Sequence, residues 1–488
     1  MSSAALWFER LTRRRSISPV IDDHHHTAGL GRSLSLLQLT LLGVGSTIGT
    51  GVFFALSETV PSAGPGVIIS FLMASIVAGL TALCYAEIAS SIPASGSSYT
   101  YAYVTMGEGV AFLIAGCLIL EYMISAGAVA IGWASYLNEA VKIISAGAID
   151  LPQALRQAPV VAIPNSAGGV NFEWSGSFMN VPAFALIWIC SFLLMRGARE
   201  SVTVNSVMVI IKILILLMFI VIAASSFEKS HFAPFLPYGI QGVSVAAGTI
   251  FFSYIGLDAV ATASEEVVNP RRNIPLAIIG ALIIVTFVYV GVAIAGLGSQ
   301  PASEFAGQQA ALAEILQKVT GVSLWALVMS VGAVISVFSI TLVTLYGQTR
   351  ILFAISRDGL LPPAFHRINP STQSPNFSVI VVAIMGSLIA GFVPASLLWD
   401  LVSIGTLVAF ATVSAALIIL RRTRPDIQRG YKVPFYPYLP IASILACFYI
   451  LFNLSGLVWV LFFGWLAFGG LYYFLHAARH SALEKRRV

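Results

Sequence analysis

The sequence predicts an all-α membrane protein that crosses the bilayer many times. The 488-residue chain is 58% hydrophobic and only 10% charged. Its mean hydropathy is +0.89, a value outside the range of soluble globular domains. The apolar residues gather in charge-poor runs of about 15 to 25 residues, the length that a helix needs to cross a hydrocarbon core of about 30 Å.

Twelve such runs are expected to be membrane-spanning helices. The first begins only after a polar, basic stretch, so no cleavable secretory signal is predicted. The last two are separated by little more than Ser455 and Gly456. We place the twelve at Leu34–Leu56, Pro65–Ala86, Val110–Glu139, Val181–Met195, Val202–Phe227, Val243–Ser264, Ile274–Leu297, Leu324–Ile355, Val379–Val393, Leu397–Leu420, Ile441–Leu454 and Gly456–Leu475.

The basic residues predict the orientation of these helices. With twelve spans, both termini lie on one side of the membrane. The segments on that side hold 21 of the 26 lysines and arginines, and the opposite segments hold four. Basic loops stay in the cytoplasm, so both termini are expected to be cytoplasmic. The net charge of +5 therefore reflects topology and does not indicate a nucleic-acid-binding surface.

The parts outside the spans offer no second domain and no metal site. We expect a disordered cytoplasmic tail over residues 1–30, a twelve-helix domain over residues 31–476 and a short tail over residues 477–488. The connection at about 140–180 is rich in proline and reads as a loop. The four cysteines fall inside spans and have no CxxC spacing; they are Cys84, Cys117, Cys190 and Cys447. Three adjacent histidines, His24–His26, are only weak evidence for a metal site, so no metal or cofactor is predicted.

Glycines indicate that two of the spans are interrupted. The first carries GVGSTIGTGVF, with glycines at 43, 45, 49 and 51, and the sixth carries FFSYIGLDAVATASEE, with Gly256 and Asp258 at mid-depth. Such glycines either let helices pack closely or unwind the helix beside a cavity. Broken helices at corresponding places in two five-helix halves are typical of inverted-repeat secondary transporters. Here the two predicted halves are residues 34–227 and 243–420, and the extra helices follow at 441–475.

A single lysine, Lys212, lies inside the fifth span, in the stretch SVMVIIKILILLMFIVIAA. The nearest flanking charges are Glu200 and Glu228, which places Lys212 more than roughly 15 Å along the helix from either. A lysine near a helix end extends to the headgroups at little cost, but one at this depth costs a few kcal/mol. An ionisable residue at such a depth is therefore predicted to be functional.

Four motifs resemble the cationic amino acid transporter family of the amino acid–polyamine–organocation superfamily. They are LGRSLSLLQLTLLGVGSTIGTGVFF, LEYMISAGAVAIGWASYLN, YIGLDAVATASEEVVNPRRNIP and LYGQTRILFAISRDGLLP, and the resemblance runs from about Gly31 to about Tyr473. It implies the leucine-transporter-type fold of 5 + 5 inverted repeats with broken helices 1 and 6. It also implies uptake of amino acids across a cell membrane, the bacterial inner membrane for the twelve-span type.

The resemblance also implies a substrate site at the two breaks. Backbone amides around Thr50 and Gly51 would hold the substrate carboxylate, since a helix N-terminus attracts anions. Carbonyls near Thr47, Ile48, Phe252 and Ile255 would accept the ammonium group, and Phe252 would close over the substrate. Neighbouring Gly49 and Ser253 complete the predicted site.

The resemblance assigns proton coupling to Lys212. In sodium-coupled members a sodium ion lies between helices 1 and 8, and in proton-coupled relatives an ammonium on helix 5 takes its place. Desolvation disfavours the charged form of such a lysine, so it is able to exchange a proton during transport. Two intramembrane carboxylates each have two possible roles. Glu121 either bridges helices or takes part in gating. Asp258 either caps the second half of helix 6 or handles a proton or cation.

Three classes of function follow from the sequence. The leading prediction is a proton-coupled importer of small neutral L-amino acids, because few carboxylates are available to neutralise a cationic side chain. The alternative is an exchanger, or a transporter of arginine and lysine, with the same fold. An enzyme or receptor is disfavoured because catalytic motifs such as HExxH and GxSxG are missing. The partners are thus an amino acid, protons and the lipid bilayer; the oligomeric state is left open, a monomer included.

Overall fold

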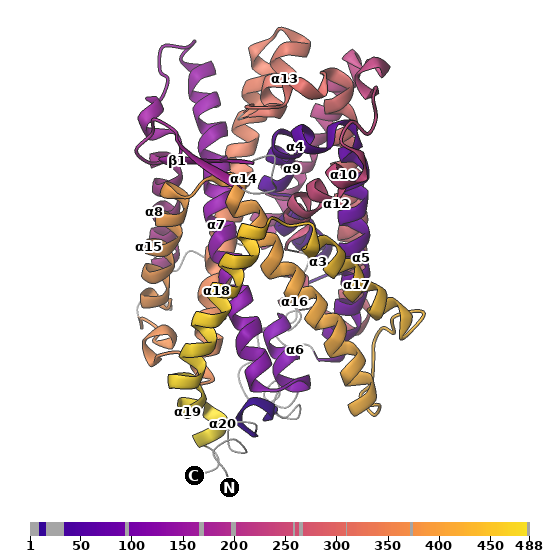
Figure 1. Ribbon diagram of the computed structural model, residues 1–488, viewed down its shortest axis with the longest axis vertical. Helices are drawn as coiled ribbons and strands as arrows, with labels where there is room; N and C mark the ends of the chain where they lie inside the picture. The colour runs from indigo at the N-terminus through magenta and orange to yellow at the C-terminus, as the bar shows by residue number, and fades with distance from the viewer. Residues whose placement is uncertain are drawn as a thin grey trace.

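The chain forms an elongated bundle of helices that run along its long axis (Figure 1). The computed structural model describes residues 9–15, 34–92, 97–164, 170–196, 202–256, 259–262, 267–308, 310–370 and 374–485. The described chain ends lie together at one end of the bundle, which we call the termini side. A β-hairpin and helix α13 (Ala311–Thr320) lie at the opposite end, the loop side.

The predicted spans all correspond to helices. The first five are α3 (Leu36–Thr47) with α4 (Thr50–Ala63), α5 (Val67–Ser91), α7 (Glu108–Ile144), α8 (Val181–Met195) and α9 (Val202–Ala223). The next five are α10 (Gly239–Phe251) with α11 (Ala259–Thr262), α12 (Pro270–Ser299), α14 (Ser323–Arg357), α15 (Asn376–Phe392) and α16 (Ala395–Thr423). Two more, α17 (Tyr438–Phe452) and α18 (Gly456–Tyr472), follow.

Length and composition support a polytopic membrane protein. Within the described residues, seven helical stretches are long and apolar enough to cross a membrane, one of which, Gly51–Ser91, joins α4 and α5 through the short helix η1 (Gly64–Gly66). Shorter apolar helices include α3, α8, α15 and α17. The all-α polytopic class is confirmed, and the count of twelve spans stays a prediction.

Several small elements were not predicted. α6 (Ser97–Thr105) lies at the termini side, and α13 at the loop side. The loop at about 140–180 contains the antiparallel strands β1 (Val160–Pro164) and β2 (Val170–Trp174), with Val161 opposite Glu173. α13 is amphipathic and ends at Gly321 in the left-handed conformation, a helix stop that a glycine supplies at low cost.

Helix α7 is the central pillar of the bundle, with α14, α15 and α16 packed around it (Figure 1). Its middle is built from small, buried residues such as Gly127, Ala128 and Ala130. Small residues let helix backbones approach closely in a membrane, where van der Waals packing holds helices together. On α16, a Cβ atom at Gly405 would lie 3.1 Å from the carbonyl oxygen of Cys117, so this contact depends on glycine.

Parts of both predicted tails are folded. Residues 9–15 pack against the start of α7, where the amide of Glu108 donates to the carbonyl of Arg13 (2.9 Å). A Cβ atom at Gly107, which has φ of +107°, would lie 2.8 Å from the carbonyl oxygen of Leu11. The C-terminal tail forms α19 (Ala478–His480) and α20 (Ala482–Lys485). The predicted disorder of residues 1–30 is therefore wrong for residues 9–15; residues 16–33, including His24–His26, lie outside the described residues.

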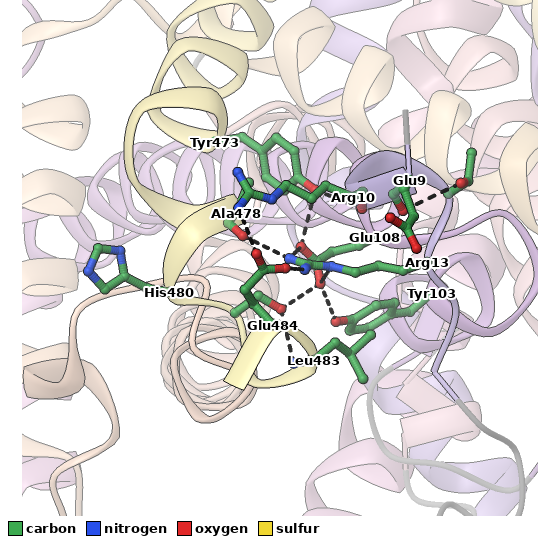
Figure 2. A network of polar contacts seen from close by, with 12 residues as sticks. Glu9, Arg10, Arg13, Tyr103, Glu108, Tyr473, Ala478, His480, Leu483 and Glu484 are labelled. Carbon is green, nitrogen blue, oxygen red and sulfur yellow. Dashed lines mark hydrogen bonds and ion pairs between the residues drawn. The ribbon is translucent and has the colours of Figure 1, made fainter. Parts of the chain in front are cut away.

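A cluster of charges joins the two chain ends, and we call Arg13, Glu108, Tyr473, Ser481 and Glu484 the terminal clasp (Figure 2). Glu108 is fully buried, and its carboxylate accepts from Arg13, Tyr473 and Ser481. Arg13 also pairs with Glu484. Burial alone would lower the pKa of Arg13, but its hydrogen bond to Glu108 and the charge of that carboxylate outweigh this effect and raise it.

A second buried carboxylate on the termini side, Glu87 of α5, fastens the end of α16. Arg421 donates to it through Nε (2.7 Å), and the amide of Val433 donates at 2.6 Å. The Arg421 guanidinium also lies 4.2 Å above the ring of Tyr436. A buried ion pair of this kind is stable only when its hydrogen bonds are satisfied, and here backbone and side chains both supply them.

Candidate functional site

The first span is broken between α3 and α4. The intrahelical hydrogen bonds of α3 end where the amide of Ile48 donates to the carbonyl of Val44 (2.7 Å). Ile48 is extended (φ −71°, ψ 90°), and Gly49 has φ −132° and ψ −139°. Gly49, the residue before α4, has no side chain that could cap the helix, and the first amides of α4 have no intrahelical partner. The break is narrower than the predicted segment Gly43–Gly51.

The glycines of the first span serve different purposes. Gly43 and Gly45 stay inside α3, and a Cβ atom at Gly43 would lie 2.7 Å from Val260, so Gly43 permits close packing. Gly49 lies in the break itself, against Ile340 of α14, where a Cβ atom would be 2.5 Å from that side chain. Gly43 thus permits close helix packing, whereas Gly49 lies where the helix is interrupted, so each of the two explanations of the glycine motif applies to a different residue.

The sixth span is broken after a short 3₁₀ turn. α10 ends at Phe251, the turn η5 covers Phe252–Tyr254, Ile255 is extended, and Gly256 has φ of +101°. A non-glycine residue is strained at that φ. The helix resumes with α11 at Ala259. Asp258 lies outside the described residues, so its predicted role as a cap is not observed.

The two breaks touch each other. The hydroxyl of Ser46 donates to the carbonyl of Gly256 (2.9 Å), and a Cβ atom at Gly256 would lie 2.7 Å from the carbonyl carbon of Ser46. Tyr289 of α12 lies beside them, with its hydroxyl 2.8 Å from the carbonyl oxygen of Thr47 and 2.9 Å from that of Ser253. Carbonyls of both breaks thus meet at one fully buried tyrosine.

Lys212 reaches the first break from α9. Its side chain is 2% exposed, and its Nζ donates to the carbonyl of Gly45 at 3.4 Å. Because the chain leaves the helix after Thr47, the Gly45 carbonyl is one of the last four that lack a full intrahelical partner. Lys212, which belongs to helix 5, therefore contacts helix 1 at its break, and its role in proton coupling stays a prediction.

Gly51 marks another close approach between the two broken helices. A Cβ atom there would lie 2.5 Å from the Cβ atom and 2.6 Å from the Cα atom of Ser253. The space on this side of Gly51 is therefore filled by the sixth span. Glycine is required at this position because the backbones of α4 and η5 approach so closely.

Phe252 belongs to an aromatic cluster on the loop side of the breaks. Its ring packs edge-on against Trp399 of α16, with centroids 4.6 Å apart. Trp399 in turn stacks on Phe54 of α4 (6.1 Å), and Phe54 meets Tyr136 of α7 (5.3 Å). Four helices thus contribute rings that cover the breaks, an arrangement that suits both core packing and the predicted lid.

Glu121 lies at the contact between α7 and α16. It is 2% exposed, and a Cβ atom on Gly405 would lie 3.5 Å from its Cβ. Both predicted roles of Glu121, bridging helices and gating, stay predictions. Reasoning from sequence missed Tyr289 and Trp399, because an aromatic residue inside an apolar span carries no signal of its own until its neighbours are known.

The bundle and its paired breaks define a class of protein. Two helices interrupted at the same depth, with freed backbone groups facing each other inside a polytopic helical bundle, are the architecture of a secondary transporter. The amino acid permease family matches residues 34–469. The chain belongs to this family, which confirms the resemblance seen in the motifs, and it is a transporter and not an enzyme.

Relatives of known name support the same conclusion. The chain is 41% identical to the methylthioribose transporter of Bacillus subtilis over 93% of its own length and 95% of that protein. It is 40% identical to the branched-chain amino acid permease BcaP of the same organism, over 97% and 99% of the two chains. It is 36% identical to the chloroplastic cationic amino acid transporter 9 of Arabidopsis thaliana, over 86% and 73%.

Proposed function

We propose that the protein imports small neutral L-amino acids together with protons, by alternating access of one site to the two sides of the membrane. The observation that carries this proposal is the pair of facing helix breaks. At one end, the first amides of α4 have no side-chain cap; at the other, η5 ends in an extended residue, Ile255. The amides suit a carboxylate, and free carbonyls suit an ammonium group.

In this proposal the two charged groups of the substrate bridge the two breaks. The carboxylate binds the amides around Gly49, Thr50 and Gly51, and the ammonium group binds carbonyls near Ile48, Phe252 and Ile255. Phe252 and Trp399 close over the bound molecule from the loop side. Every α-amino acid carries these two groups, so this part of the site recognises the class, and the remaining walls select the side chain.

The side chains around the breaks favour a neutral substrate. Ile340 packs against Gly49, Ser253 against Gly51 and Tyr289 against Thr47. None of these is a carboxylate, and the ammonium group of Lys212 lies at Gly45. A desolvated guanidinium or second ammonium would therefore gain no counter-charge from these residues. The names of the two Bacillus relatives, a branched-chain amino acid permease and a methylthioribose transporter, agree with uncharged side groups.

Lys212 is the proposed coupling group. Protonated, its Nζ fastens α9 to the freed Gly45 carbonyl of α3, which holds the half-helix in place. After the proton leaves, that hydrogen bond weakens and α3 is free to move, which opens the site to the cytoplasm. The charge asymmetry of the sequence supports cytoplasmic termini, so the termini side faces the cytoplasm of a bacterial cell in this proposal.

Substrate competition tests the proposal directly. Purified protein in liposomes is given radiolabelled L-alanine, and unlabelled L-alanine, L-valine, L-arginine and methylthioribose are added in excess. We expect the neutral amino acids to compete better than arginine. Stronger competition by arginine would favour the cationic alternative, and competition by methylthioribose alone would overturn amino acid transport. Uptake that needs internal amino acid would favour exchange.

A further inference from the structure

Tyr289 connects the two breaks from a helix that is itself unbroken. Its hydroxyl lies 2.8 Å from the Thr47 carbonyl and 2.9 Å from the Ser253 carbonyl, and its side chain is fully buried. The ring is held edge-on by Tyr254 (centroids 5.5 Å apart) and by Phe71 (6.1 Å). Both rings come from neighbouring elements, so the hydroxyl has little freedom to move away from the breaks.

A second contact joins the same two breaks. The Ser46 hydroxyl lies 2.9 Å from the Gly256 carbonyl oxygen and 2.8 Å from that of Leu42 in its own helix, and it is able to donate to either. Thr47 and Ser46 are adjacent in the first span, and Ser253 and Gly256 lie on either side of the extended Ile255 in the sixth. The two broken segments are therefore in contact at two points. At one, the Tyr289 hydroxyl lies between two backbone carbonyls, and at the other, the Ser46 hydroxyl faces one.

One reading of these contacts is purely structural. Freed carbonyls inside a membrane must be hydrogen-bonded, because an unsatisfied one costs several kcal/mol. That need would be met equally well by two separate donors, one for each break. A single hydroxyl shared by carbonyls of both breaks has an additional consequence, since it fixes the distance between the broken segments.

We propose that Tyr289 is a positioning residue that makes the site selective for α-amino acids over β-amino acids. The inference rests on the proposed function, in which amides of the first span hold the carboxylate, and the ammonium group bridges the Ile48 carbonyl of the first span and carbonyls of the sixth. Tyr289 and Ser46 set the spacing between these two sets of groups. A β-amino acid carries one more carbon between its charged groups, a difference of about 1.5 Å, and fits that spacing poorly.

The test compares two ligands on the same variant. Affinities of L-alanine and β-alanine are measured by competition against radiolabelled L-alanine on the purified protein. Tyr289→Phe removes the hydroxyl and keeps the ring, and we expect the preference for L-alanine to fall about tenfold, the equivalent of one hydrogen bond. Tyr449→Phe is the control, because its hydroxyl lies 2.8 Å from that of Ser244 in α10 and contacts neither carbonyl to which Tyr289 is bonded. Its preference should stay within about twofold of wild type.

A ratio of affinities separates positioning from general damage. A variant that is only less stable loses both ligands equally, so its preference is unchanged. Ser46→Ala removes the second fastening point and should also lower the preference, which keeps the test valid if Tyr289→Phe does not fold. Unchanged preference in both variants would overturn the inference and leave the proposed function intact. Wild-type protein that binds no α-amino acid would overturn the proposed function itself.

Discussion

At the scale of single residues, burial explains why a lysine is tolerated in the middle of the fifth span. α9 has a buried stripe of Val209, Lys212, Leu216, Phe219 and Ala223, at the spacing of one helix face. Its other face carries exposed aliphatic side chains such as Val207, Leu214 and Val221. Lys212 therefore points into the protein, toward the Gly45 carbonyl, and away from lipid.

Lys212→Ala should abolish accumulation driven by a proton gradient. The variant lacks the group that we propose to gain and lose the proton, so the ratio of internal to external substrate should fall to about one. One pH unit is worth about 1.4 kcal/mol per proton, or tenfold accumulation in the wild type. Lys229→Ala, at an exposed position between helices, is the control and should accumulate normally. A Lys212→Ala variant that still concentrates substrate would leave the lysine a structural tie.

Gly51→Val should remove substrate binding at a step before transport. The β-branched side chain would collide with Ser253 and force α4 away from η5, which displaces the amides that hold the carboxylate. We expect at least a hundredfold loss of affinity in an expressed, folded protein, measured by ligand binding with size-exclusion chromatography as the folding check. Gly469→Val, with nothing within 4 Å of its Cβ position, should bind normally. Wild-type affinity in Gly51→Val would place the carboxylate site elsewhere.

At the scale of helices, the sequence predicted which elements break but not how the breaks meet. Runs of apolar residues located the spans, and glycine-rich motifs located the two interruptions, because both signals are local in the chain. The contacts of Ser46 with Gly256 and of Tyr289 with Thr47 and Ser253 join residues far apart in sequence. A single sequence does not show which distant residues lie close together in space, so these contacts could be found only in the structure.

Gly256→Ala should damage the site through the geometry of the sixth span. Its φ of +101° is strained for any side chain, and the added Cβ would lie 2.7 Å from the Ser46 carbonyl carbon. The fastening of the two breaks should therefore be lost, with an affinity for L-alanine lowered at least tenfold. Gly464→Ala in α18, where nothing lies within 4 Å, is the matched control. Equal affinity in the two variants would contradict a role for this contact.

At the scale of the whole molecule, the termini side is held by buried ion pairs that the sequence did not predict. A charge outside the membrane spans is usually solvated, so nothing in the sequence indicated burial of Arg13, Glu108 or Glu484. Their burial depends on residues 9–15 folding back against α7 and α19, contacts that span nearly the whole chain. The count of basic residues predicts that the termini side faces the cytoplasm, and this orientation stays a prediction.

Glu108→Gln should destabilise the fold much more than Glu484→Gln. Glu108 is fully buried, and Glu108→Gln leaves Arg13 with a neutral partner there and with the partly exposed Glu484 as its counter-charge. Breaking a buried pair costs about 3 kcal/mol or more, and a surface pair costs about 1 kcal/mol or less. At about 2 °C per kcal/mol, Tm should fall by about 6 °C in the first variant and by at most about 2 °C in the second. Thermal unfolding in detergent measures both, and equal shifts would show that the clasp is not a stabilising core.

The most direct test of the account is uptake of L-alanine by the wild-type protein in liposomes with an imposed pH gradient. With the outside more acidic by one unit, no sodium and no internal amino acid, we predict accumulation of about tenfold. Adding sodium should change nothing, and collapsing the gradient with a protonophore should abolish accumulation. Uptake that requires sodium, or that proceeds only against internal amino acid, would contradict proton-coupled import.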